Sequence, residues 1–486
     1  MPVCDTLIRN ALVVDGSGGE PATADVALAG DRIVVVGSRL GYGAEEVIDA
    51  AGHVLAPGFI DVHTHDDTSV IRTPEMLPKL SQGVTTVIVG NCGISAAPVR
   101  LTGDPPDPMN LLGDASVFRY PTFAVYVAAV DAACPAVNVA ALVGHTALRN
   151  NHMDRLDRAA TKDEIEAMRR QLIEALDGGA VGLSTGLAYL SANAATIDEV
   201  LALAEPLTRA GGIYTTHLRS ETRAIIDALR EAFTIGRGCR VPVVISHLKC
   251  AGVDNWGRSS EVLRELDAVR ASQAVSWDCY PYTAGSSTLD LRQVDERVEI
   301  RITWSAPHPE MGGRMLAQVA RDWGMSQTEA ARRLQPAGAI YHSISEDDMR
   351  QILTHPGTMI GSDGLPNDPL PHPRLWGTFP RVLGKYSRDE KLLPLAQAVH
   401  KMTGLPAARF GFTERGLVRE GYFADLVLFD PNKICDTATF ESPVSSAEGI
   451  EGVWVNGVPS YRSGSPTGQR SGRFIKRSAV VTKSKF

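Results

Sequence analysis

Short apolar runs alternate with helical stretches through the middle of the chain. Eight such runs lie at residues 59–62, 84–89, 137–143, 180–183, 212–216, 241–245, 273–277 and 358–360. The clearest helix between them begins at Thr161, where Glu164 completes a capping box, and its apolar residues recur at helical spacing. Alternating strands and helices are typical of a parallel sheet, and eight repeats close a TIM barrel. We therefore predict an α/β fold with a (β/α)8 barrel over residues 58–412.

The two ends of the chain have a different pattern, in which short alternating strands are separated by turn residues. Such strands are expected at residues 6–14, 25–29, 32–36, 424–429 and 452–457. We expect both ends to form one small β-sandwich domain of residues 1–57 and 413–480. The gap between the seventh and eighth apolar runs is too long for one helix. Residues from about 286 to 345 are therefore predicted to be an inserted lid segment over the barrel mouth.

Composition narrows the classes of partner. The 486 residues carry a formal net charge of −8, which argues against nucleic acid or an anionic membrane as a partner. The N-terminus lacks the basic and apolar regions of a signal peptide, and no apolar stretch is long enough to span a bilayer. Seven scattered cysteines do not resemble a disulfide framework. We expect a cytoplasmic protein, and the sequence does not determine its oligomeric state.

Side chains that can ligate a metal follow several of the predicted strands. His63 and His65 lie one residue apart on a strand and therefore share a face. Four further candidates come at the C-terminal ends of predicted strands, where such barrels place their chemistry: Cys92, His217, His247 and Asp363. Each has an ordinary structural explanation when taken alone, but six at one barrel mouth favour a single metal centre, and the donors suit Zn²⁺. His145, after the third strand, is either structural or a neighbour of this centre.

The candidate ligands and their order along the strands resemble those of a known protein family, and the resemblance covers nearly the whole chain. The pattern resembles the amidohydrolase superfamily, which hydrolyses amides and related bonds on a metal-bearing barrel beside a small β domain. Many members carry a carboxylated lysine on the fourth strand, whereas residues 182–186 read GLSTG here and Cys92 replaces the lysine. This departure resembles the N-acyl-D-amino-acid deacylases, also called D-aminoacylases, as do the motifs GNCG at 90–93, SHLKC at 246–250, GSDG at 361–364 and HPR at 372–374.

The resemblance implies zinc-dependent hydrolysis of N-acyl-D-amino acids to a carboxylate and a free D-amino acid. It implies one tight zinc on Cys92, His217 and His247, and a second site, weak or vacant, on His63, His65 and Asp363. Asp363 would also be the general base that takes a proton from the attacking water. Cyclic-amide hydrolysis, as in hydantoinases and dihydroorotases, is a rival that the thiolate ligand and the missing lysine disfavour. A barrel that has lost catalysis would not be expected to retain all six ligands.

The resemblance also implies how a small anionic substrate is held. Lys249, Tyr280 and Arg374 match family positions that grip the α-carboxylate of the substrate, and Tyr189 would steady the acyl carbonyl. Arg292 lies where members that accept acidic side chains carry an arginine, so N-acyl-D-glutamate is the expected substrate. N-acyl-D-aspartate and a broad range of apolar side chains are the alternatives. An ordinary arginine on the surface of the inserted segment is the competing explanation for Arg292.

Overall fold

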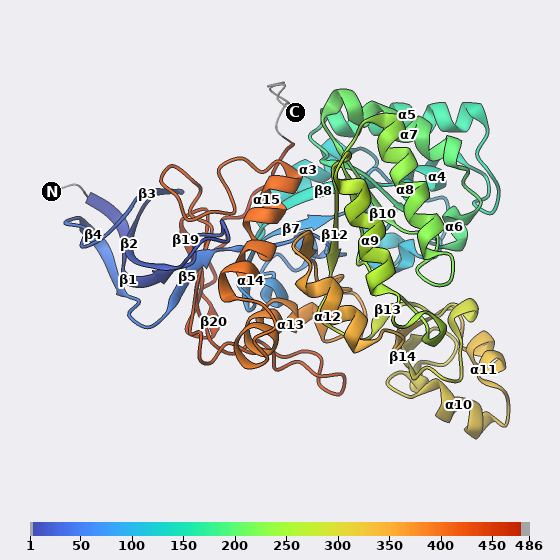
Figure 1. Cartoon of the computed structure of the whole chain (residues 1–486). Coiled ribbons are helices and arrows are strands. Elements are labelled where there is room, and N and C mark those ends of the chain that lie inside the picture. The colour runs from blue at the N-terminus through green and yellow to red at the C-terminus, as the bar shows by residue number, and fades with distance from the viewer. Residues whose placement is uncertain (1–2, 478–486) are drawn as a thin grey trace.

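A computed structural model describes residues 3–477 of the chain, so the predicted end of the β domain at residue 480 lies outside the described residues. Eight parallel strands form the central sheet (Figure 1): β6 Phe59–Asp61, β7 Val84–Val89, β8 Asn138–Gly144, β9 Gly182–Gly186, β10 Ile213–His217, β11 Val243–Ile245, β12 Val275–Cys279 and β16 Thr358–Ile360. Each overlaps one of the predicted apolar runs, with bounds shifted by up to three residues, and successive barrel strands pair in the sheet. The predicted barrel is therefore confirmed.

The first and last barrel strands meet along a seam just beyond their C-terminal ends. The backbone N–H of Asp363 donates to the carbonyl of His63 at 2.6 Å, and the N–H of His65 donates to the carbonyl of Gly364 at 3.0 Å. Thr64 and Gly364 form a parallel bridge at the same place. The sheet is thus nearly closed by the segments that carry three of the predicted ligands.

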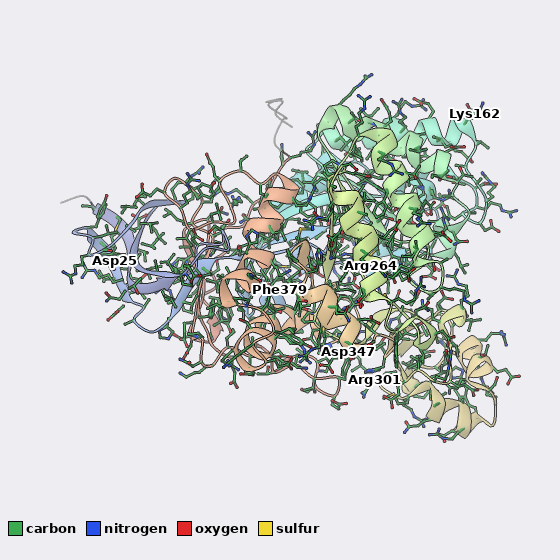
Figure 2. All side chains as sticks on the ribbon, in the orientation of Figure 1. Asp25, Lys162, Arg264, Arg301, Asp347 and Phe379 are labelled. Carbon is green, nitrogen blue, oxygen red and sulfur yellow. The ribbon has the colours of Figure 1, made fainter. Side chains whose placement is uncertain are left out.

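The barrel strands are buried on both faces, which explains why they appear in the sequence as continuous apolar runs. Along β7, Val87 and Val89 pack outward in the large cluster shared with the helices, whereas Ile88 packs inward with residues of other strands. The predicted capping box is present at Thr161 and begins α5, Lys162–Asp177. In Figure 2, Lys162 lies on the exposed outer surface of that helix.

The remaining helices surround the barrel or support its loops. They are α1 Ser69–Arg72, α2 Leu77–Leu80, α3 Phe123–Ala133, α4 His145–His152, α6 Leu190–Asn193, α7 Ile197–Ala210, α8 Ile225–Cys239, α9 Ser259–Arg270, α12 Glu346–Thr354, α13 Arg374–Arg381, α14 Leu395–Met402 and α15 Gly404–Phe410. Phe379 on α13 is buried and stacks on Phe59 of the first barrel strand, with ring centroids 5.8 Å apart. None of the described helices combines the length and the apolar character needed to cross a membrane.

Both ends of the chain build one β-sheet domain, as predicted, while its description as a sandwich stays a prediction. Its strands are β1 Val3–Val13, β2 Ala22–Ala29, β3 Arg32–Gly37, β4 Gly43–Asp49, β5 Val54–Pro57, β17 Leu426–Phe429, β18 Ile450–Val455, β19 Val458–Arg462 and β20 Ser465–Pro466. Hydrogen bonds join the nine strands into a single sheet, in which β5 pairs with β17 and so links the two ends. Ile8, Leu426 and Trp454 belong to its buried core.

Between β12 and β16 the chain leaves the barrel and forms a separate small unit. Its strands β13 Gly285–Thr288, β14 Ile300–Ser305 and β15 Ala337–Tyr341 form an antiparallel sheet, with β15 in the middle. Helices α10 Leu316–Trp323 and α11 Gln327–Leu334 share a buried core with this sheet. Figure 1 shows the unit projecting from the barrel on the side away from the β domain. Its role as a lid, and the exact division of the chain into domains, stay predictions.

Candidate active site

The predicted ligands converge at the C-terminal ends of the barrel strands. The Sγ of Cys92 lies 3.2 Å from His63 Nε2 and 3.3 Å from His247 Nε2. Asp363 Oδ1 lies 3.4 Å from His63 Nε2 and 3.2 Å from His65 Nε2. All five side chains are buried. The structure therefore brings together side chains that are up to 300 positions apart in the chain, from His63 to Asp363. The donor atoms of these two residues, Cys92 and His247 lie close enough to bind one metal ion.

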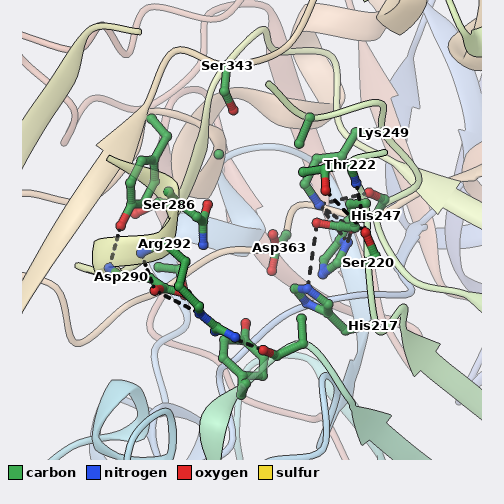
Figure 3. A pocket seen from close by; sticks show the side chains of 18 of the residues that line it. His217, Ser220, Thr222, His247, Lys249, Ser286, Asp290, Arg292, Ser343 and Asp363 are labelled. Atoms are coloured by element: carbon green, nitrogen blue, oxygen red, sulfur yellow. Dashed lines mark hydrogen bonds and ion pairs between the residues drawn. The ribbon is translucent and has the colours of Figure 1, made fainter. Parts of the chain in front are cut away.

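His217 completes the group from the end of β10. Its ring lies nearly perpendicular to that of His247, with centroids 4.4 Å apart. Its Nε2 is 3.6 Å from Glu221 Oε2, and His247 Nδ1 is 3.0 Å from Glu221 Oε1. Figure 3 shows His217 and His247 facing the same cavity as Asp363. All six predicted ligands thus lie at one barrel mouth.

Strained turns present these side chains. Cys92, His247 and Asp363 have φ angles of 53°, 35° and 47°, a region that residues other than glycine seldom adopt. Gly90, before Cys92, also has a positive φ of 80°, and a Cβ there would collide with the carbonyl of Leu142. Such backbone strain concentrates at functional sites. Gly90 is therefore needed at this position, because only glycine lets the chain turn after β7 so that the Cys92 thiol faces the barrel mouth.

The charges at the mouth hold Cys92 and Asp363 in their anionic forms, which are the forms that bind metals. Burial raises the pKa of Cys92, but positive charge on His63 and His247 outweighs burial and holds this pKa well below its usual range. Burial also raises the pKa of Asp363, whereas the charges of Arg374 and His247 lower that pKa well below its usual range. A thiolate and a carboxylate beside imidazoles are the donors that zinc takes.

Two histidines add evidence that the donor set is incomplete without an ion. Within the described chain, Nδ1 of His65 and Nδ1 of His217 are buried and have no hydrogen-bond partner. Buried polar atoms are normally paired, and an unpaired one calls for an explanation such as an ion. The donor atoms of His63, Cys92, His247 and Asp363 also lie within 4.8 Å of one another. These residues therefore fit a zinc centre.

Three residues predicted to grip a carboxylate lie beside this centre. Arg374 Nη2 contacts Asp363 Oδ2 at 2.8 Å, and its guanidinium lies 4.5 Å from the centroid of the Tyr280 ring. Among the described residues no partner exists for the Tyr280 hydroxyl or for Nε and Nη1 of buried Arg374. Lys249 Nζ contacts Glu221 Oε1 at 2.6 Å and His247 Nδ1 at 2.9 Å. Unpaired donors next to a cation form a ready site for an anion.

Tyr189 and Arg292 line the same cavity. The Tyr189 ring lies 4.9 Å from the His217 ring, centroid to centroid. Arg292 is not free, because its Nε lies 3.0 Å from both carboxylate oxygens of Asp290 and its Nη2 donates to the Ala188 carbonyl at 2.9 Å. Figure 3 shows this ion pair across the cavity from His217. The sequence analysis did not anticipate that Asp290 neutralises Arg292.

Other acidic residues near the centre were missed by the sequence analysis. Asp278 Oδ1 lies 3.3 Å from His63 Nδ1. The same oxygen accepts a hydrogen bond from the backbone N–H of His247 at 3.0 Å. Asp278 follows the seventh apolar run directly, so the rule that found Asp363 would also have found it. Glu221 comes four residues after His217, without a pattern that distinguishes it from an ordinary surface glutamate.

The contacts of His145 decide between a structural role and a place beside the metal centre. Its Nε2 lies 2.9 Å from Glu199 Oε1, and the same oxygen also pairs with Arg149. All three side chains are buried at the packing of α4 against the start of α7. His145 is therefore part of a structural ion-pair network.

Comparison with known proteins agrees with this geometry. The model of the amidohydrolase family matches residues 46–461. A D-aminoacylase of Alcaligenes xylosoxydans xylosoxydans is 50% identical over 98% of this chain and 98% of its own length. The N-acyl-D-aspartate deacylase of the same organism is 48% identical over 97% and 95% of the two chains, and its N-acyl-D-glutamate deacylase is 45% identical over 98% and 97%.

Solved structures give the same answer. A crystal structure of D-aminoacylase matches with a TM-score of 0.96 at 50% identity, covering 98% of this chain and 100% of the other. The N-acyl-D-glutamate deacylase of Bordetella bronchiseptica, complexed with zinc and a phosphonate inhibitor, matches with a TM-score of 0.94 at 44% identity over the same shares. The class is thus a metal-dependent amidohydrolase. Within that class, the chain belongs to the D-aminoacylase family.

Proposed function

We propose that this enzyme is a zinc-dependent N-acyl-D-amino-acid deacylase that prefers N-acyl-D-glutamate. The curated relatives named above are D-aminoacylases and deacylases of N-acyl-D-aspartate and N-acyl-D-glutamate. Their identities of 50%, 48% and 45% lie too close together to select one side chain. The preference therefore rests on the pocket of this chain.

Zinc is the metal proposed for the centre. The Bordetella relative is complexed with zinc, and a binuclear centre with activation by one metal and attenuation by a second is described for D-aminoacylase. By this proposal Cys92, His217 and His247 hold the tight ion, and a second, weaker site uses His63, His65 and Asp363. This division follows the family resemblance, and His63 lies close to members of both groups. A bound zinc polarises a carbonyl and lowers the pKa of water towards neutrality.

Asp363 is the proposed general base. The neighbouring positive charges keep its pKa well below the usual range, so it is ionised at neutral pH and can accept a proton from the attacking water. It would then return that proton to the amine nitrogen as the amide bond breaks. Its Oδ2 is held by Arg374 at 2.8 Å and its Oδ1 by His65 at 3.2 Å, so both contacts fix its orientation.

One observation carries the proposed substrate class, namely unpaired anion-binding donors beside the ligand cluster. Arg374 and Tyr280 would donate hydrogen bonds to the α-carboxylate of the substrate, with Lys249 next to them. Arg292 lines the same cavity and would bind the side-chain carboxylate of D-glutamate. Tyr189 would donate to the acyl carbonyl. Two separate cationic positions suit a substrate with two carboxylates.

The proposal is tested by a substrate screen on enzyme of defined zinc content. N-acetyl derivatives of D- and L-glutamate, aspartate and leucine are compared with hydantoin and dihydrouracil. Release of amine is measured for the linear amides, and formation of the ring-opened carboxylate for the cyclic ones. We expect turnover of the D derivatives, fastest for D-glutamate. Equal rates for both enantiomers, or faster opening of the cyclic amides, would contradict the proposed class. A D-aspartate or D-leucine optimum would overturn only the side-chain preference.

A cytoplasmic location also stays a prediction.

A further inference from the structure

A lysine with no exposed surface lies directly behind the proposed second metal site. Lys79, on the short helix α2, is 0% exposed. Its ammonium contacts Asp61 Oδ2 at 2.7 Å, Thr64 Oγ1 at 2.9 Å, Ser362 Oγ at 2.9 Å and Asp66 Oδ2 at 3.1 Å. Burying an ammonium is costly unless it is paired and hydrogen-bonded, as it is here. So many contacts in one place indicate a specific role.

The partners of Lys79 come from both sides of the barrel seam. Asp61 Oδ1 accepts the backbone N–H of Ser362 at 2.8 Å, and Asp61 Oδ2 accepts the Ser362 hydroxyl at 2.6 Å. Ser362 Oγ in turn accepts the N–H of Gly364 at 3.1 Å. On the other side, the Thr64 hydroxyl donates to Asp66 Oδ2 at 2.7 Å. The network therefore ties residues 61–66 to residues 362–364.

These two segments carry one group of ligands and not the other. His63 and His65 alternate with the network members after β6, and Asp363 lies between Ser362 and Gly364. The remaining proposed ligands, Cys92, His217 and His247, come from other strands and have no contact with the Lys79 ammonium. A change in the network thus acts first on His63, His65 and Asp363, and reaches Cys92 through its contact with His63.

We propose that Lys79 is a positioning residue that holds the His63, His65 and Asp363 segments in register, and so sets the second metal site and the orientation of the base. Its ammonium contacts Asp61, Thr64, Asp66 and Ser362, and none of the six proposed ligand side chains. Residues behind the ligands of a metal typically change metal affinity or activity by 10- to 100-fold when replaced. This inference rests on the proposed roles of Asp363 and of the two metal positions.

The chain offers a matched control. Lys401, on α14, is a second buried lysine with 2% exposure, and its ammonium donates to the backbone carbonyls of His355 and Thr358. It contacts neither ligand segment. Lys401→Met should therefore lower thermal stability without changing zinc binding or kcat. Comparing it with Lys79→Met separates general loss of a buried lysine from an effect on the site.

The test combines zinc binding with kinetics on the full-length enzyme. Equilibrium dialysis over a range of free Zn²⁺ measures both binding events, and N-acetyl-D-glutamate hydrolysis gives kcat and KM. We expect Lys79→Met to keep the tight zinc and a KM close to that of the wild type. The affinity for the second zinc and kcat should each fall by about 10- to 100-fold. Because losing a buried charge can prevent folding, Ser362→Ala serves as a second variant. It should also weaken the second zinc and lower kcat, but by smaller factors than Lys79→Met.

Two results would overturn the inference. One is loss of both zinc ions together from a folded variant, and the other is an unchanged kcat and second-zinc affinity in Ser362→Ala. If the wild type binds one zinc only, the kcat of Ser362→Ala decides. If the proposed function is wrong, the wild type will fail to hydrolyse the substrate, whereas the zinc-binding comparison needs no substrate and still tests the role of Lys79.

Discussion

The pair formed by Arg292 and Asp290 gives the sharpest prediction about specificity. If Arg292 binds the side-chain carboxylate of the substrate, Arg292→Leu removes a charge-assisted hydrogen bond that only acidic substrates make. Such a bond contributes about 1.5–3 kcal/mol, which corresponds to a factor of about 10 to 150. The ratio of kcat/KM for N-acetyl-D-glutamate over N-acetyl-D-leucine should fall accordingly.

The structure places the effect near the lower end of this range. The Arg292 side chain is 49% exposed, and Asp290 already pairs with it at 2.6 Å. A substrate carboxylate must therefore compete with Asp290 in a partly solvated place. A loss of about tenfold is expected for Arg292→Leu. Asp290→Asn removes the competing charge, and since exposed pairs contribute about 0.2–1 kcal/mol, the preference for D-glutamate should rise by up to about fivefold.

A second arginine in the inserted segment serves as the control for these variants. Arg297 pairs with Asp295 at 2.7 Å in the same i, i−2 arrangement, is 53% exposed and does not line the cavity. Steady-state kinetics on both substrates are compared for wild type, Arg292→Leu, Asp290→Asn and Arg297→Leu. Arg297→Leu should leave the ratio unchanged. An unchanged ratio in Arg292→Leu, whether both substrates lose activity equally or neither does, would refute the assignment of Arg292.

Three further predictions concern the metal, the carboxylate clamp and stability. Cys92→Ser should lose the tight zinc on dialysis and more than about 100-fold in kcat, and full zinc retention by metal analysis would contradict its role as a ligand. Lys249→Met should raise KM about tenfold and change kcat less, which steady-state kinetics will show. Burial raises the pKa of Glu199, but His145 and Arg149 lower it to about 2, so its ion pair stabilises the fold above pH 4.5 and is lost as pH falls towards 2. Glu199→Gln should therefore destabilise the enzyme by about 3–5 kcal/mol at neutral pH, with a smaller difference in acid, as measured by denaturant unfolding.

The barrel and the positions of the candidate ligands at its mouth were predictable because the relevant signals are local. Each barrel strand is a short run buried on both faces, and each candidate ligand lies at or just after the C-terminal end of its strand. His63 and His65 needed only the alternation of a strand. The convergence of Cys92, His247 and Asp363 then follows from the common edge of a parallel barrel.

Pairings between distant segments could not be predicted in the same way. Lys79 lies on a helix of four residues, and its partner Ser362 is 283 positions away. A buried lysine has no sequence signature, because lysines are ordinarily exposed. The partner of Arg292 was near in sequence, yet whether Asp290 turns towards it depends on the turn at 290–293. Such contacts are decided by tertiary packing.

The most direct test of the whole account is the replacement of Asp363 by Asn. Asparagine preserves the size of the side chain but cannot accept the proton, and removing a general base typically costs about 100- to 10,000-fold in rate. We predict that Asp363→Asn keeps one tightly bound zinc per chain while kcat on N-acetyl-D-glutamate falls by this factor. Substantial turnover, or loss of the tight zinc together with activity, would contradict a base that acts beside a zinc held by Cys92, His217 and His247.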